Sequence, residues 1–121
     1  MSLDFSAWLL DTEALLETER AALAWRRIND KPSSVAFRTP AGATLAAQTV
    51  RLEFSGVSER TSDAGPGAVR TVTVFGVRNH ATVADTIIGK GYRFVSGPDE
   101  YVVVDVIQTL GEVQARAEAV S

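Results

Sequence analysis

The hydrophobic and polar positions divide the chain into two parts with different periods. From residue 4 to residue 28 there is no glycine or proline, and alanine, leucine, glutamate and arginine, which favour helix, predominate. After Pro32 apolar and polar residues mostly alternate, which is the period of a strand. The pattern predicts an N-terminal helix over residues 1–31, either continuous or broken near residues 11–12. A β domain over residues 32–121 is expected to follow.

The apolar residues of the predicted helix do not form one stripe. The first set follows helical spacing: Phe5, Trp8, Leu9, Thr12, Leu16 and Leu23. The second set lies on other faces: Leu10, Leu15, Trp25 and Ile28. A helix with apolar side chains on several faces needs more than one partner. It can lie between the sheet and its own chain, or it can present Trp8 or Trp25 to a neighbouring subunit, since exposed aromatic residues mark interfaces.

The first β segments predict a hairpin and a central strand. Residues 33–38 and 44–54 flank Thr39-Pro40-Ala41-Gly42, where proline in the second position and glycine in the fourth suit a type I turn. Residues 69–77 carry apolar side chains on both faces, which is typical of a strand in the middle of a sheet.

The C-terminal segments predict a second hairpin and a last strand. Residues 92–95 and 101–110 pair across the Gly97-Pro98-Asp99-Glu100 turn, and the valines that follow this turn favour strand. Alanine in residues 112–119 favours helix, but small apolar and polar residues alternate strictly there. We expect a closing strand, with small residues inward and polar residues protecting its edge. The chain is therefore predicted to be mainly β with α: a small antiparallel β-barrel or sandwich of about six strands, preceded by a long N-terminal helix.

Residues 55–68 interrupt the strands with glycine, serine, aspartate and proline. The sequence predicts a long mobile loop there, because the segment has too little apolar surface to fold alone. A solvated excursion is the leading interpretation, and a loop that contacts a partner is the alternative, since long loops are often functional or become ordered on binding.

Composition and charge restrict the class of protein. The 121 residues suit one domain, and 45% hydrophobic with 22% charged residues is the composition of an ordinary folded protein. The net charge of -3 argues against tight binding of phosphates, which needs clustered lysine and arginine. Without cysteine there is no disulfide or thiolate metal site. No apolar run approaches the roughly 20 residues of a membrane helix, so we expect an untargeted protein without membrane contact.

No residues combine into a site for catalysis, a cofactor or a metal. His80 is the only histidine, so zinc would need carboxylates for every other ligand. No G-x-S-x-G motif presents a serine to it, and we expect His80 to bond its loop neighbours instead. Gly89-Lys90-Gly91 lacks the upstream glycine and the following serine or threonine of a phosphate loop. The adjacent Asp99 and Glu100 are expected to be turn residues. The sequence predicts no enzyme and no cofactor.

A nucleic-acid-binding barrel is an alternative function. Such a barrel needs aromatic residues interleaved with basic ones on one sheet face. The residues that could supply this pattern are Phe75, Arg78, Tyr92, Arg93, Phe94 and Tyr101.

Residues 74–119 resemble the neck proteins of tailed bacteriophages, the head-closure, head-completion or head-tail joining family. The family often has an Asp-x-x-Ile-x-x-Gly-Asp-Arg-Phe segment, a short turn and Tyr-x-Val-x-x-Val. The matching residues here are Asp85, Ile88, Gly91, Arg93, Phe94, Tyr101, Val103 and Val106. Tyr92 stands where the family commonly has an acid.

The resemblance implies a structural virion protein, assembled in the host cytoplasm. The subunit would form a homo-oligomeric ring between portal and tail, and its partners would be portal or adaptor proteins and tail proteins. Packaged DNA would pass through the channel without sequence-specific binding. A tail-completion or minor capsid protein is the related alternative. Ring subunits meet head to tail, so two different surfaces must fit each other. The candidate interface residues are Trp8, Trp25, Arg26, Arg27, Glu59, Arg60 and Asp63.

Overall fold

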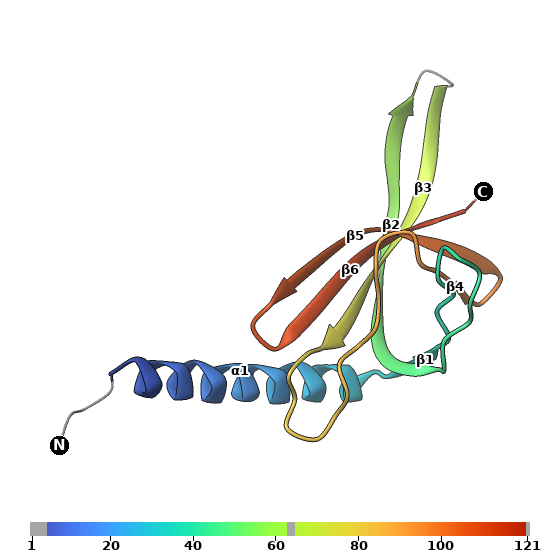
Figure 1. The fold of residues 1–121 in the computed structure, drawn as a ribbon. Helices are drawn as coiled ribbons and strands as arrows, with labels where there is room; N and C mark the ends of the chain where they lie inside the picture. The colour runs from blue at the N-terminus through green and yellow to red at the C-terminus, as the bar shows by residue number, and fades with distance from the viewer. Residues whose placement is uncertain (1–4, 63–64, 121) are drawn as a thin grey trace.

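The computed structural model describes the backbone of residues 5–62 and 65–120, and the side chains of residues 15–55 and 70–120. Within these residues the chain forms one helix and six strands (Figure 1). They are α1 (Phe5–Asp30), β1 (Ser33–Val35), β2 (Gln48–Ser62), β3 (Gly65–Val77), β4 (Arg93–Ser96), β5 (Asp99–Thr109) and β6 (Glu112–Ala119). The predicted long helix is continuous through residues 11–12, and the C-terminal segment is a strand as expected.

The six strands form one antiparallel sheet in the order β1-β2-β3-β6-β5-β4. The sheet curls until its two ends meet. Arg38, just after β1, and Arg93, the first residue of β4, exchange backbone hydrogen bonds of 2.8 and 2.9 Å. The side chain of Glu100 lies beside this seam and accepts a hydrogen bond of 2.7 Å from Arg38 Nη2. The sheet is therefore a nearly closed barrel, which confirms the predicted fold class.

Apolar side chains from the barrel strands and the segment after β1 fill the interior of the barrel. Phe94 packs edge-on against Phe37 and stacks on Tyr101, with 5.4 Å between ring centroids in each pair. β6 contributes the small residues Ala115 and Ala117 to this core. β6 lies between β3 and β5, so the expectation that its polar residues protect a sheet edge was wrong. These residues occupy the outer face of a central strand, and the barrel ends instead at β1 and β4.

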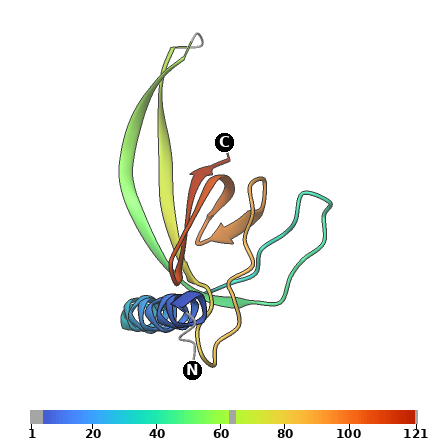
Figure 2. The same cartoon turned by 60° about the vertical axis from the view of Figure 1, so that its left-hand side comes forward.

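α1 crosses one end of the barrel and packs on β2, β3 and β6 (Figures 1 and 2). Its buried residues are Ala21, Ala24 and Ile28, which lie against Val77. The stripe that followed helical spacing in the sequence does not supply this contact, because Leu16 and Leu23 are 44% and 58% exposed.

Small residues face the barrel because Gly111, in the β5–β6 turn, reaches the backbone of the helix. A Cβ atom on Gly111 would lie 2.3 Å from the backbone nitrogen of Ala21 and 2.8 Å from the carbonyl oxygen of Glu17. Real side chains do not approach this closely. The turn and the helix backbone therefore fit only with glycine at position 111, and the small side chain of Ala21 is fully buried at this contact.

The loop predicted over residues 55–68 was wrong. β2 and β3 stay paired from Ser55 with Thr71 to Ser62 with Gly65, apart from an irregularity in register between Ser55 and Val57. β6 pairs with β3 only over Thr71–Val77, so residues 55–62 and 65–70 form a two-stranded ribbon that projects beyond the barrel (Figures 1 and 2). We call this ribbon the hairpin arm. Its strands pair through backbone groups, which glycine and serine also provide, so a composition poor in apolar residues did not prevent pairing.

Replacing Gly111 with alanine should loosen the helix from the barrel. Both Gly111 and Gly97 have positive φ, at 73° and 61°, but no atom lies within 4 Å of a Cβ built on Gly97. Gly97→Ala is thus a control for backbone strain alone. We expect Gly111→Ala to lower the free energy of unfolding by roughly 1–3 kcal/mol more than Gly97→Ala, which urea denaturation can measure. Equal losses would mean that the close contact costs nothing.

Tyr101 should make the stability of the barrel sensitive to alkaline pH. Burial raises the pKa of its phenol above the ordinary value of 10.0, Asp99 raises this pKa further, and Arg70 opposes the shift. The folded state then holds the proton more tightly than the unfolded chain. The stabilisation is complete below about pH 10 and is lost as the pH rises toward the folded pKa.

Comparison with Tyr101→Phe isolates this effect. The difference in unfolding free energy between the two proteins should be constant near neutral pH and should move in favour of Tyr101→Phe above about pH 10. Urea denaturation at a series of pH values provides the measurement. Curves that stay parallel up to pH 11, about one unit above the ordinary phenol pKa, would contradict the prediction.

Candidate functional site

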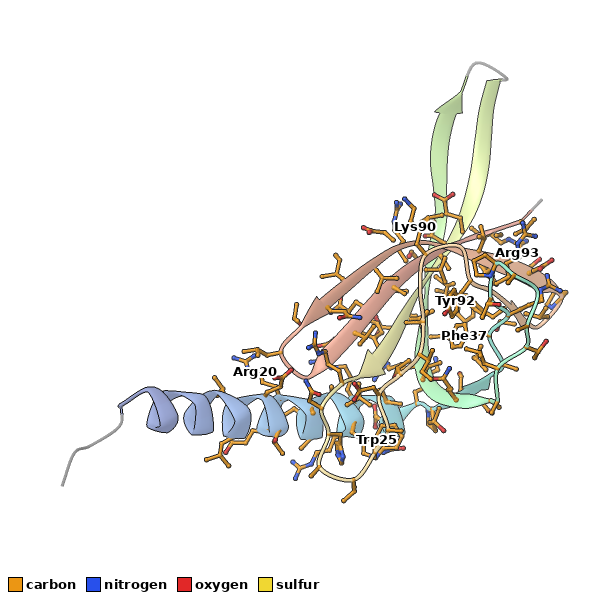
Figure 3. The ribbon with its side chains drawn as sticks, in the orientation of Figure 1. Arg20, Trp25, Phe37, Lys90, Tyr92 and Arg93 are labelled. Carbon is orange, nitrogen blue, oxygen red and sulfur yellow. The ribbon has the colours of Figure 1, made fainter. Side chains whose placement is uncertain are left out.

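A groove runs between α1 and the β5–β6 turn. Its volume is about 350 Å³, and the residues that line it are Arg20, Leu23, Ala24, Arg27, Thr109, Leu110 and Glu112. Figure 3 shows Arg20 on the side of α1 that faces the turn. Leu23 and Leu110 are 58% and 48% exposed, while Ala24 is buried. We call this feature the helix groove: its lining is part apolar and part polar, with an arginine toward each end of its helical side.

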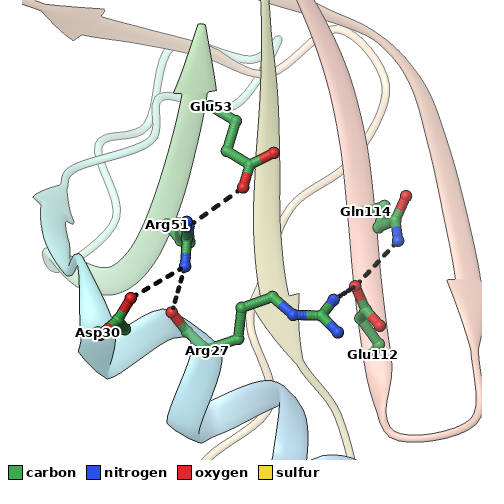
Figure 4. Close-up of polar contacts among 6 residues, drawn as sticks. All are labelled: Arg27, Asp30, Arg51, Glu53, Glu112 and Gln114. Atoms are coloured by element: carbon green, nitrogen blue, oxygen red, sulfur yellow. Dashed lines mark hydrogen bonds and ion pairs between the residues drawn. The ribbon is translucent and has the colours of Figure 1, made fainter.

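Polar contacts hold the C-terminal side of the helix groove in place (Figure 4). Arg27 Nη1 lies 3.4 Å from Glu112 Oε1, which also accepts a hydrogen bond of 2.9 Å from Gln114 Nε2. Arg51 Nη1, on β2, donates 3.0 Å to the carbonyl oxygen of Arg27 and lies 3.8 Å from the carboxylate of Asp30. This guanidinium occupies the helix C-terminus, where carbonyls lack helical partners and a positive charge is favoured.

The Nε atom of Arg51 makes weaker polar contacts than its Nη1 atom. It lies 3.2 Å from Glu53 Oε1, an ion pair whose geometry is not that of a hydrogen bond. The guanidinium is thus held mainly through its Nη1 contacts with the helix. Arg51 therefore acts as a clamp between β2 and the end of α1.

The N-terminal part of α1 extends past the barrel. The described contacts of α1 with the barrel and its connecting loops involve Glu17 and later residues: Glu17 Oε1 accepts 2.7 Å from Asn79 Nδ2 and lies 3.4 Å from Arg78 Nε. Residues 5–16, which we call the helix arm, project beyond the β5–β6 turn (Figure 1). Leu15 and Leu16, at the base of this arm, are 67% and 44% exposed.

His80 has a structural place in the loop between β3 and β4. Its Nδ1 atom accepts backbone hydrogen bonds of 3.1 Å from Thr82 and Val83, and its ring lies edge-on to Trp25 with centroids 6.1 Å apart. The expectation that His80 bonds its loop neighbours is confirmed. Nδ1 is thereby used as an acceptor for the backbone.

The aromatic residues proposed for nucleic-acid binding do not form an exposed stacking surface. Phe94 and Tyr101 are buried in the barrel, and Phe75 packs beside the cluster under α1. Tyr92 is half-buried, while Arg93 is exposed at the seam. Stacking on bases requires exposed ring faces, which these buried rings lack.

The candidate interface residues lie in different surroundings. Trp25 is half-buried and packs against the cluster under α1 (Figure 3), Arg26 is exposed, and Arg27 lines the helix groove. The structure thus places one of the predicted residues in the groove and another in the core beneath the helix. The remaining residues lie outside the described side chains: Trp8, Glu59, Arg60 and Asp63.

The groove also contains residues that the sequence analysis did not single out as a surface. Arg20 and Leu23 were assigned to the helix, and Leu110 to the end of a strand, with nothing to bring them together. The local signal was Gly111 after the apolar strand, since glycine permits a tight turn and a close approach of the backbone to another element.

Metal coordination and membrane spanning are two further possibilities for the described part of the chain. No group of three or more histidine, aspartate and glutamate side chains there could hold a metal ion. Among the same residues, no helix is both long and apolar enough to cross a membrane. The sequence matches no protein-family model and no curated protein.

Removing the Arg51 guanidinium should weaken the attachment of α1. Arg51→Met keeps much of the side-chain volume but loses the bond to the Arg27 carbonyl, so the free energy of unfolding should fall by roughly 1–3 kcal/mol. Arg116→Met is the control, because the Arg116 side chain is 59% exposed on β6 and its ion pair is with Glu118 of the same strand. Denaturation of both variants should show a change below about 0.5 kcal/mol for the control. Equal effects would exclude a clamp role.

Proposed function

We propose that this protein is a structural virion subunit of a tailed phage, a head-tail connector that forms a ring between portal and tail. The observation that carries the proposal is a small barrel from which two arms project, the helix arm and the hairpin arm (Figure 1). Such a subunit needs a rigid body and separate surfaces that reach its neighbours. The barrel would be the rigid body, and the two arms would contact the neighbouring subunits.

The distribution of apolar side chains supports an assembly role. Leu15, Leu16 and Leu23 are exposed on α1, Leu110 on the β5–β6 turn, and Phe54 at the base of the hairpin arm. Leu23 and Leu110 line the same groove, and apolar residues exposed together on a folded protein are typical of surfaces that a partner covers. Because these residues lie on different elements, they suit a subunit that meets one neighbour on each side.

The residues on which the resemblance to phage neck proteins rests have structural roles in the barrel. Gly91 has φ of 87°, and its N–H donates 2.8 Å to the carbonyl of Val103. Arg93 forms the seam with Arg38, and Phe94 and Tyr101 stack in the core. The similar segment therefore builds the part of the sheet that closes the barrel, which supports a shared architecture rather than a shared catalytic site.

The proposed partners follow from this role. The ring would contact a portal or adaptor protein on one side and a tail protein on the other. DNA would pass through the ring without sequence-specific binding, which the net charge of -3 favours because it supplies no excess of phosphate-binding cations. The protein would be found in the virion.

Binding to the portal tests this function. The purified chain should form a ring on the portal encoded beside it, visible by negative-stain electron microscopy as added density and by light scattering as added mass. A portal from an unrelated phage is the control and should stay unoccupied. A chain that binds the tail tube but not the portal would point to a tail-completion protein instead. A chain that binds neither would contradict the proposal.

A further inference from the structure

We infer that the helix groove is the docking site for the helix arm of a second copy of this chain, so that neighbouring subunits join head to tail. This inference rests on the proposed function, which requires neighbouring copies, and it names the surfaces through which they meet. Three observations lead to it: the shape of the groove, the exposed base of the arm and the charges of both.

The groove has the form that accepts an amphipathic helix. Leu23 and Leu110 line the groove and are exposed, and Ala24, which also lines it, is buried, so the groove offers both small and large apolar surface. Helices dock in such grooves through a few apolar anchors one or two turns apart. Along α1 the groove runs from Arg20 to Arg27, which corresponds to about 10 Å at 1.5 Å per residue.

The helix arm supplies an occupant of suitable length. Its twelve residues, 5–16, extend about 18 Å, enough to cover the groove. Most of the stability of a helix in a protein comes from packing its apolar face, and Leu15 and Leu16 at the base of the arm are exposed. A neighbouring groove would cover this arm.

The charges are complementary. The helix arm, residues 5–16, contains Asp11 and Glu13 and no lysine or arginine. The groove carries Arg20, for which no ion pair is described, and Arg27, which pairs with Glu112 of the same groove, and Arg26 is exposed beside Arg27 on the helix. Opposite charges on the rims of an apolar contact direct the partner and set its orientation.

The arm cannot enter the groove of its own chain. Arm and groove belong to successive parts of one continuous helix, so the arm leads away from Arg20 rather than back over it. The occupant must then be another molecule. Each copy offers both an arm and a groove. Reciprocal exchange between two copies would give a closed pair, whereas one contact with each neighbour gives a ring or a filament, which is the arrangement that the proposed ring requires.

Cysteine cross-linking tests the contact, because the natural chain has no cysteine. One variant carries Thr12→Cys in the arm and the other Leu23→Cys in the groove. These positions are eleven residues, or about 16 Å, apart on one helix, so no disulfide can form within a chain. Under mild oxidation the mixture should yield a covalent dimer several-fold in excess of either variant alone.

Controls separate docking from chance collision. Ala22→Cys replaces Leu23→Cys: Ala22 is exposed but lies about 100° away around the helix. Its mixture with Thr12→Cys should give several-fold less dimer. Arg20→Glu in the groove chain should also reduce the yield, whereas Arg116→Glu on the barrel should not. Equal yields with Leu23→Cys and Ala22→Cys, or no dimer at all, would overturn the inference.

A chain with both Thr12→Cys and Leu23→Cys tests the head-to-tail order. It should form a ladder of covalent species larger than the dimer. A reaction that stops at the dimer would show a two-fold helix pair and would also overturn the inference. The portal experiment distinguishes the two proposals. A ring on the portal without cross-links would contradict only the docking contact. Cross-links without portal binding would contradict only the connector function.

Discussion

The contact between the β5–β6 turn and the backbone of α1 determines how the rest of the molecule is arranged. Gly111 touches the helix near Glu17 and Ala21, at a distance that no side chain permits. Among the described side chains of the helix, Ala21 and Ala24 face the barrel, and Leu15, Leu16 and Leu23 are left exposed. Because the turn meets the helix at residue 17 and beyond, the preceding turns of α1 project as an arm. The groove, the exposed leucines and the arm are all consequences of one close approach.

The closed barrel supports this contact. Its two edges, at β1 and β4, are joined without a full ladder of backbone hydrogen bonds. The Arg38–Arg93 backbone pair closes the seam, and the stacked rings of Phe94 and Tyr101 fill the space behind it. β2 and β3 extend beyond the barrel because β6 ends at Ala119. This end lies opposite the point where the register between β2 and β3 becomes irregular. The same pair of strands is thus barrel wall at one end and free ribbon at the other. A rigid centre with two projecting elements is a suitable subunit for assembly by neighbour contacts.

The polar contacts divide the surface into parts that support the fold and parts that are open to a partner. Arg51 and Glu112 hold the end of α1 against the sheet, and Arg70, at the base of the hairpin arm, lies 2.7 Å from Asp99. Leu23 and Leu110 line the helix groove together with Arg27 and Glu112, whose ion pair joins α1 to β6, and both leucines are exposed. The helix groove therefore has firmly supported walls, which limits the entropy lost when a partner docks.

The sequence by itself determined the elements: the uninterrupted helix, the alternation of β6 and the turns at Gly42 and Gly97 all follow from local periodicity and glycine or proline placement. It did not determine which face of α1 is buried. Leu16 and Leu23 have the spacing of a buried stripe, and only the close contact of Gly111 with the helix backbone shows that another face is buried. It also misjudged residues 55–68, where pairing depends on backbone bonds to a strand across the turn rather than on apolar side chains. The groove was hidden for the same reason: Arg20, Leu23 and Leu110 become neighbours only when the turn meets the helix. Periodicity is a property of nearby residues, whereas the choice of buried face depends on what the rest of the chain packs against it.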